Sequence, residues 1–166
     1  MRADKVYLVG FMACGKTTVA RALARRLGWR AVDVDELIEQ REHLSVAEIF
    51  ARHGEPHFRA VEHAVLLDQL PPRHVVVATG GGTFTDIQNR AAINRDGVSV
   101  WLDVPLDRLI ARVPSDGRRP LAADRQGFER LYHQRRVTYE HAHLRLDAGR
   151  SSVEEIVDQL VDWLER

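Results

Sequence analysis

The sequence has one cysteine, no excess charge of either sign and no apolar run long enough to cross a membrane. Cys14 is the only thiol in 166 residues, so no disulfide can form within the chain, and this usage fits a reducing compartment. Lysine and arginine together number 24, as do aspartate and glutamate, which argues against nucleic-acid or membrane-surface binding driven by bulk charge. The first residues show no apolar core of a secretory signal. We therefore expect a cytoplasmic protein that binds neither nucleic acid nor membranes.

Short apolar runs alternate with helical patterns along the chain. The expected strands are residues 5–9, 30–34, 74–78, 98–102 and 143–146. Near-continuous apolar runs suit parallel strands that are buried on both faces. Capping motifs at Ser45, Thr85 and Ser152, and a proline at 105, indicate helix starts. Because the chain has no internal repeat or linker, it predicts one α/β domain over residues 1–166, a three-layer, doubly wound parallel sheet of about five strands.

A glycine-rich loop follows the first expected strand. Gly10, Gly15, Lys16 and Thr17 occupy every required position of the P-loop pattern G-x-x-x-x-G-K-T. In such a loop the backbone N–H groups surround the phosphates of a nucleotide, and glycine allows the backbone to approach them closely. The lysine reaches the β- and γ-phosphate oxygens, and the threonine hydroxyl ligates Mg²⁺. A helical pattern from about Lys16 to a stop at Gly28 supplies the expected context.

Two carboxylates stand at the end of the second expected strand. Asp33 and Asp35 alternate along the chain, so on a strand both would project from one face, at the edge where ligands of open α/β sheets bind. One could hold Mg²⁺ and the other could accept a proton from a substrate hydroxyl. The alternative for Asp35 is capping of the next helix, which would leave Asp33 unexplained.

Three further segments carry chemistry. Gly80, Gly81 and Gly82 follow the third strand, and they offer either free N–H groups for a small anion or a tight strand-to-helix turn. Residues 35–61, with a break at 54–56, interrupt the alternation and are interpreted as a substrate-binding segment. Residues 114–124 are polar and arginine-bearing, which fits either a mobile lid over a phosphate or a plain surface loop.

Together these motifs resemble the shikimate kinase family of nucleoside-monophosphate-kinase-like P-loop kinases. The motifs that carry the resemblance are GFMACGKT at 10–17, DVD at 33–35, GEPHFR at 54–59 with Glu62, TGGG at 79–82, RRPL at 118–121, and Arg135 four residues before Tyr139. They occur in the family's order and span nearly the whole chain. The resemblance implies transfer of the ATP γ-phosphoryl group to the 3-hydroxyl of shikimate, on the route to chorismate and the aromatic amino acids.

The resemblance also implies roles for individual residues. The expected acceptor-binding residues are Asp35, Arg59, Gly80, Gly81, Gly82 and Arg135, with both arginines on the shikimate carboxylate and Asp35 as catalytic base. Lys16 and Arg119 are the other expected catalytic residues, and Thr17 and Asp33 are expected to serve Mg²⁺. The expected nucleotide contacts are Gly10, Ala13, Cys14, Gly15, Lys16, Thr17, Thr18, Arg112, Arg119 and Arg150. Arginine in pairs suits a carboxylate because its planar fork binds two oxygens at once.

Some details depart from the family pattern or leave alternatives open. Many members have glycine where this chain has Ala13, so the loop is expected to use a conformation accessible to alanine there. Cys14 is either a reactive thiol near a helix N-terminus or a small filler side chain. His53 and His57 are interpreted as surface or substrate-rim residues rather than metal ligands.

Two other functions compete with this prediction. One is a related small-molecule kinase, such as a gluconate kinase, and the other is a nucleotide-binding regulatory protein without catalysis. A monomer is expected.

Overall fold

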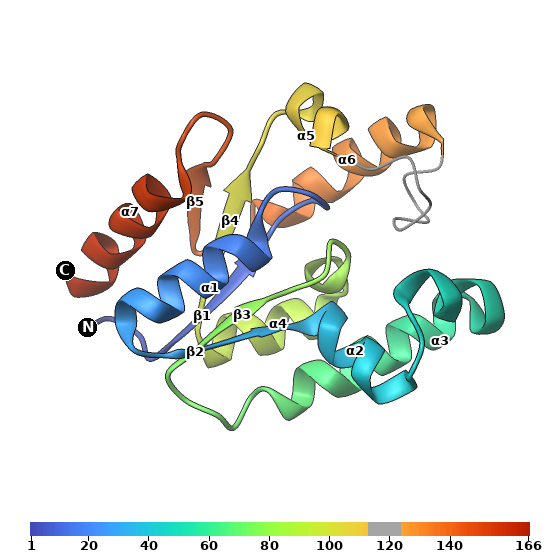
Figure 1. The fold of residues 1–166 in the computed structure, drawn as a ribbon, viewed down its shortest axis with the longest axis horizontal. Helices are drawn as coiled ribbons and strands as arrows, with labels where there is room; N and C mark the ends of the chain where they lie inside the picture. The colour runs from blue at the N-terminus through green and yellow to red at the C-terminus, as the bar shows by residue number, and fades with distance from the viewer. Residues whose placement is uncertain (113–123) are drawn as a thin grey trace.

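The computed structural model describes residues 1–112 and 124–166, and it contains a five-stranded parallel sheet in the order β2-β3-β1-β4-β5 (Figure 1). The strands are β1 (Lys5–Val9), β2 (Arg30–Asp33), β3 (Val75–Ala78), β4 (Val98–Asp103) and β5 (Leu144–Asp147). The helices are α1 (Lys16–Leu27), α2 (Val34–Glu42), α3 (Val46–Asp68), the 3-10 turn η1 (Thr83–Thr85), α4 (Ile87–Asp96), α5 (Leu106–Arg112), α6 (Arg125–Tyr139) and α7 (Val153–Glu165). No helix in these two ranges is long and apolar enough to span a bilayer.

The strand order places helices on both faces of the sheet. The connection from β1 to β2 through α1 runs toward the β2 edge of the sheet. The connection from β3 to β4 through α4 runs in the opposite direction, toward the β5 edge. Because such crossovers are right-handed, α1 and α4 lie on opposite faces. Helix α7 packs beside α1, as Figure 1 shows. The expected α/β, doubly wound sheet is therefore confirmed, and all five strands direct their carboxyl ends to one edge.

The strand boundaries shift by one residue at several expected ends. β2 ends at Asp33 rather than at 34, because Val34 already belongs to α2. β3 begins at Val75 rather than at 74, because His74 has a left-handed backbone with φ of 56°. β4 and β5 each extend further than expected, to a final pair between Asp103 and Asp147.

The helix signals are mostly confirmed, with one correction. Ser45 and Ser152 cap α3 and α7 as expected, and the break at Gly54 is a kink within α3, where φ is 81°. The cap of α4, however, is Asp86 and not Thr85: the Asp86 carboxylate accepts from the N–H groups of Gln88 and Asn89. The Thr85 hydroxyl donates instead to the Gly82 carbonyl at 2.6 Å, which closes the 3-10 turn.

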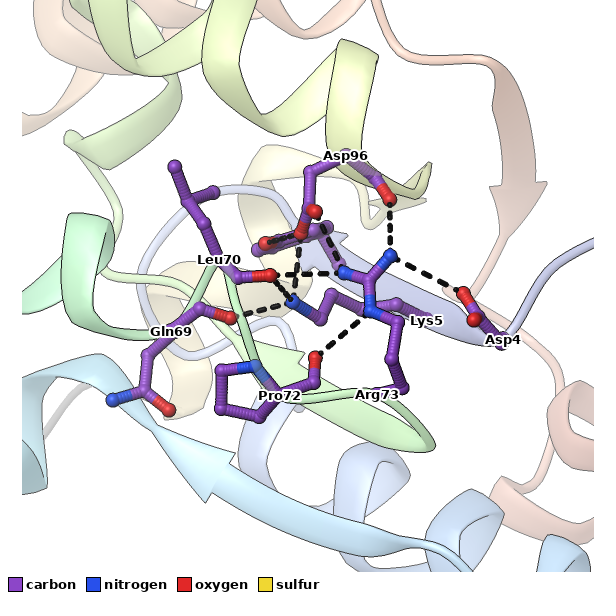
Figure 2. A network of polar contacts seen from close by, with 8 residues as sticks. Asp4, Lys5, Gln69, Leu70, Pro72, Arg73 and Asp96 are labelled. Atoms are coloured by element: carbon purple, nitrogen blue, oxygen red, sulfur yellow. Dashed lines mark hydrogen bonds and ion pairs between the residues drawn. The ribbon is translucent and has the colours of Figure 1, made fainter.

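A buried polar network fixes the opposite, amino-terminal edge of the sheet (Figure 2). The Lys5 ammonium, in a side chain with no exposed surface, donates to the Asp96 carboxylate at 2.7 Å and to carbonyl oxygens of residues 69 and 70. Asp96 also accepts from the Tyr7 hydroxyl at 2.5 Å and from Arg73 at 2.6 Å. The network joins β1, the α3–β3 connection and the end of α4, and so holds the central strand in place.

Candidate active site

A cavity of about 770 Å³ lies at the carboxyl ends of the strands. The expected site residues that line it are Ala13, Gly15, Lys16, Thr17, Thr18, Asp33, Asp35, Arg59, Gly80, Gly81, Gly82, Arg112 and Arg135. They come from the loop after β1, the first turn of α1, the end of β2, the start of α2, the second half of α3, the loop after β3, α5 and α6. Thirteen residues that are far apart in the sequence therefore share one concave surface, at the edge where ligands bind in this class of fold.

The P-loop follows a fully buried β1 and leads directly into α1. Gly10 and Gly15 have positive φ values of 149° and 98°, which glycine adopts without steric cost. Ala13 also has a positive φ, of 66°, so the expectation of a conformation easily accessible to alanine is wrong. The loop imposes a left-handed backbone that costs about 1–2 kcal/mol for a residue with a Cβ atom.

The functional groups of Lys16 and Thr17 have protein partners in this structure. The Lys16 ammonium donates to the carbonyl oxygens of Gly10 at 2.7 Å and Phe11 at 3.0 Å. The Thr17 hydroxyl donates to one oxygen of Asp33, and the other Asp33 oxygen accepts from the Glu36 N–H at 3.0 Å. The metal-binding pair expected from the sequence therefore lies in direct contact.

The carboxylates at 33 and 35 stand on different elements, which corrects the expectation of a shared strand face. Asp33 is the last residue of β2 and the N-cap of α2, whereas Asp35 lies in the first turn of that helix. The capping alternative was thus assigned to the wrong residue. Both side chains still line the cavity, because the strand-to-helix junction turns within two residues.

Arg59 is held by two carboxylates from its own helix. Its guanidinium donates to both oxygens of Glu62, at 2.9 and 3.1 Å, and to Glu55 at 3.3 Å. Burial disfavours the charged form of Arg59, but the Glu62 and Glu55 carboxylates outweigh it and hold the pKa of Arg59 above its usual value. The Glu62 side chain is only 1% exposed, so this pair forms a fixed wall of the cavity.

Arg135 differs from Arg59 because no carboxylate pairs with it among the residues that the structure describes. It is 6% exposed, and its guanidinium carbon lies 5.8 Å from the ring centre of Phe11. Burial lowers the pKa of Arg135 below its usual value, and the nearby Arg59 acts in the same direction. An anion bound between Arg59 and Arg135 would stabilise the charged form of Arg135.

The glycine loop, which consists of Gly80, Gly81 and Gly82, makes room for the guanidinium groups of Arg59 and Arg135. A Cβ atom on Gly82 would lie 2.5 Å from an Arg59 nitrogen, and one on Gly81 would lie 3.1 Å from an Arg135 nitrogen. The Gly80 N–H is already used, because it donates to the Thr83 hydroxyl at 2.9 Å. Of the three expected free N–H groups, only those of Gly81 and Gly82 lack a partner within the described part of the chain. The segment is also a tight turn, as the alternative interpretation of the triple glycine predicts.

Other expected residues do not line the cavity. Gly10 and Cys14 belong to the P-loop but are buried, and the Cys14 sulfur is 3.8 Å from the Lys16 ammonium. Arg150 is exposed and is not among the lining residues. Arg119 and nearly all of the expected lid at 114–124 lie outside the described residues.

Several residues complete the cavity or its walls although no role for them was predicted from the sequence. Phe50, Phe58 and Glu39 line it from α2 and α3, and Thr83 lies directly behind the glycine loop. His57 contacts Glu42 at 3.3 Å and stacks on His53.

Among the described residues no group of three or more histidine, cysteine or acidic side chains could hold a metal ion. A cation at Thr17 and Asp33 would therefore take its remaining ligands from phosphate and water.

Comparison with known proteins identifies the family. The family model described as shikimate kinase matches residues 12–165. A shikimate kinase from Geobacter metallireducens is 40% identical over 163 residues, covering 96% of this chain and 91% of the relative. The solved shikimate kinase from Acinetobacter baumannii in complex with shikimate has a TM-score of 0.93 at 32% identity, over 98% of this chain and 93% of that one. The enzyme from Aquifex aeolicus has a TM-score of 0.87 at 33% identity, over 97% and 96%.

A family model matched over most of the chain, and a relative 40% identical over nearly its full length, agree with the motifs gathered in the cavity. This chain belongs to the shikimate kinase family.

Proposed function

We propose that this chain transfers the γ-phosphoryl group of ATP to the 3-hydroxyl of shikimate, giving shikimate 3-phosphate and ADP for the synthesis of chorismate and the aromatic amino acids. The observation that carries the proposal is one cavity that holds both a phosphate-binding loop and two arginines beside a glycine loop. ATP and a small carboxylate acceptor suit these two sets of groups. Membership of the family, and a relative solved with shikimate, support the same acceptor.

The acceptor carboxylate is bound by Arg59 and Arg135, with the N–H groups of Gly81 and Gly82 beside it. The buried Arg135 supplies a positive charge with no carboxylate partner in the described part of the chain. Gly80 contributes shape rather than a hydrogen bond, because Thr83 occupies its N–H. This arrangement selects a small anion, since charge-assisted hydrogen bonds in a partly enclosed cavity are stronger than in water.

The nucleotide phosphates are bound by the P-loop backbone and by Lys16, which exchanges its present carbonyl partners for phosphate oxygens. Thr18 and Arg112 border the same region, and the Arg112 guanidinium donates to the Ala13 carbonyl at 3.4 Å. By resemblance, Arg119 stabilises the transferring group and Arg150 lies near the adenine. Thr17 and Asp33 fit Mg²⁺ because they place two oxygen ligands in contact, and the ion would neutralise charge on the phosphates.

Asp35 acts on the reacting hydroxyl. Its carboxylate orients the 3-hydroxyl of shikimate and accepts its proton as the oxygen attacks the γ-phosphorus. The new oxygen–phosphorus bond forms while the bond to the β,γ-bridging oxygen breaks, and ADP leaves with that electron pair. Because phosphoryl transfer depends mainly on positioning and electrostatic stabilisation, the arginines and the P-loop contribute more than basicity alone.

An acceptor panel tests the proposal. ADP release is measured with ATP and Mg²⁺ in three reactions, containing shikimate, gluconate or no acceptor. The proposal expects turnover with shikimate and only background release in the other two. Release with gluconate alone would favour a different small-molecule kinase, and binding of ATP without release in any reaction would favour a regulatory protein.

The oligomeric state and the compartment belong to the same proposal. One chain supplies all the side chains assigned to ATP, Mg²⁺ and shikimate, so we propose a monomeric enzyme. The pathway intermediates it uses and the single, buried Cys14 fit the cytoplasm.

A further inference from the structure

The hydroxyl of Thr83 connects two parts of the acceptor site. Thr83 has no exposed surface and lies at the start of η1. Its oxygen accepts a hydrogen bond from the Gly80 N–H at 2.9 Å. The same oxygen lies 2.9 Å from the Glu62 carboxylate, to which it donates. Twenty-one residues separate Thr83 from Glu62, so no local pattern in the sequence predicts this contact.

Chemistry fixes the direction of the two hydrogen bonds that Thr83 makes with Gly80 and Glu62. A backbone N–H can only donate and an ionised carboxylate can only accept, so the single Thr83 proton is committed to Glu62. Glu62 in turn accepts from Arg59 at both of its oxygens. The glycine loop and the Arg59 guanidinium are therefore joined through one hydroxyl and one carboxylate, and both of these connecting groups are buried.

The backbone of Thr83 is held as firmly as its side chain. The Asn89 amide donates to the Thr83 carbonyl at 3.1 Å, and the Asn89 oxygen contacts a His63 ring nitrogen at 2.6 Å. Asn89 is itself buried. Because helix α4 anchors this backbone, the hydroxyl has little freedom to follow a movement of either partner.

We propose that Thr83 is a positioning residue that sets the spacing between the glycine loop and Arg59, and so the fit of the acceptor carboxylate. The inference rests on the proposed function, since it takes the carboxylate of shikimate as the anion that both parts bind. The tolerance is small, because Arg59 already lies 2.5 Å from the place where a Cβ atom on Gly82 would be. A small displacement of one part relative to the other misaligns a bidentate contact.

The test compares Thr83→Val, which removes the hydroxyl at nearly constant volume, with Thr83→Ser, which keeps it. We expect Thr83→Val to raise the KM and the calorimetric Kd for shikimate about tenfold, while the KM for ATP stays within about twofold. Thr83→Ser should restore the shikimate values to within about threefold of wild type. If Thr83→Val does not fold, Thr83→Ala is measured in its place, with the same expected separation between shikimate and ATP.

Ser99→Ala is the matched control for loss of a buried hydroxyl. Ser99 also has no exposed surface, accepts from a backbone N–H (His143, 3.0 Å) and donates to a side-chain oxygen (Asn94, 2.6 Å). It stands near the amino-terminal end of β4, at the edge opposite the cavity. Its loss should lower the midpoint of thermal unfolding and leave the KM for shikimate unchanged.

A double-mutant cycle with Arg59→Lys shows whether Thr83 acts through that arginine. If it does, the double variant should raise the shikimate KM by clearly less than the product of the two single effects, by a factor of at least three. Three results would each overturn the inference. The first is a double-variant effect on the shikimate KM equal to the product of the two single effects. The others are equal changes in the constants for ATP and shikimate, and an unchanged shikimate Kd in folded Thr83→Val. Failure of the proposed function appears separately, as a wild-type protein that does not phosphorylate shikimate at all.

Discussion

The Thr17 hydroxyl and the Asp33 carboxylate are hydrogen-bonded to each other across the gap between α1 and β2. Asp33 uses its two oxygens for different purposes: one accepts from Thr17, and the other caps α2 through the Glu36 N–H. A metal ion can therefore replace the contact between the two side chains without uncapping the helix. The folded chain itself therefore brings the two proposed metal ligands into contact.

Asp33→Asn should raise the Mg²⁺ concentration needed for half-maximal activity about tenfold, because a neutral amide is a poorer ligand for a hard cation. Folding should change little, since asparagine caps helices as well as aspartate does. Asp86→Asn is the control, because the Asp86 carboxylate also caps a helix, α4, and does not line the cavity. Activity is titrated with Mg²⁺ at saturating ATP, and equal curves for Asp33→Asn and wild type would remove Asp33 from the metal site.

Asp35→Asn should lower turnover by on the order of 10²–10⁴, the usual cost of losing a general base, with part of the loss due to poorer orientation of the hydroxyl. ATP·Mg²⁺ should still bind, since Asp35 is assigned to the acceptor. Turnover, Mg²⁺ dependence and nucleotide affinity are measured beside Asp33→Asn. If both variants shift Mg²⁺ dependence equally and leave shikimate binding unchanged, both residues belong to the metal side.

Arg135→Lys keeps a positive charge but loses the planar fork, so the KM for shikimate should rise about tenfold or more with ATP binding nearly unchanged. Arg59→Lys should act in the same direction, and it should also disturb Glu62, which would lose one of its two bonds to the guanidinium. Arg130→Lys, at an exposed position of α6, is the matched control. Shikimate affinity that is unaltered in Arg135→Lys would place this arginine outside the acceptor site.

Asp96→Asn should destabilise the fold by about 3 kcal/mol, because it leaves the buried Lys5 ammonium without its carboxylate (Figure 2). Asp158→Asn removes an exposed partner of Arg26 and should cost less than about 1 kcal/mol. Free energies of unfolding in urea at pH 7 make the comparison. Equal losses in the two variants would mean that the buried network contributes no more than a surface ion pair.

The same network predicts an acid dependence of stability. Burial alone would raise the pKa of Asp96, but hydrogen bonds from Lys5, Tyr7 and Arg73 outweigh it and hold that pKa below its usual value. A carboxyl group with a lowered pKa in the folded state stabilises the protein above its unfolded pKa of about 3.9, and this contribution is lost as the pH falls through the folded value. The difference in unfolding free energy between wild type and Asp96→Asn should therefore shrink between pH 5 and pH 2. A difference that stays constant over this range would contradict the assignment.

The sequence predicts the elements that depend on local patterns. The P-loop, the helix from Lys16 to the stop at Gly28, and the five strands follow from spacing and from apolar runs, and the structure confirms them. The errors occur where two local signals compete within a residue or two. Asp33 and Asp35 are both plausible caps of α2, and Asp33, which also accepts from Thr17, is the one that caps it. Thr85 and Asp86 are both plausible caps of α4, and Asp86 caps it because the Thr85 hydroxyl donates to the Gly82 carbonyl.

The contacts that support the site could not be predicted because they join distant parts of the chain. The Tyr139 hydroxyl donates to the Gly81 carbonyl at 2.5 Å across 58 residues, and Thr83 reaches Glu62 across 21. Neither pair leaves a periodic or spacing signal. The motifs therefore predict which residues act, whereas the structure shows which residues hold them in place.

Analysis of the products of a single reaction shows directly whether the chain phosphorylates shikimate at the 3-hydroxyl. The protein is incubated with ATP, Mg²⁺ and shikimate, and the products are quantified by mass spectrometry and ³¹P nuclear magnetic resonance. We expect one ADP for each shikimate monophosphate, with the phosphorus coupled to the proton at carbon 3. ADP without a phosphorylated acceptor, or a phosphate on another hydroxyl, would contradict it.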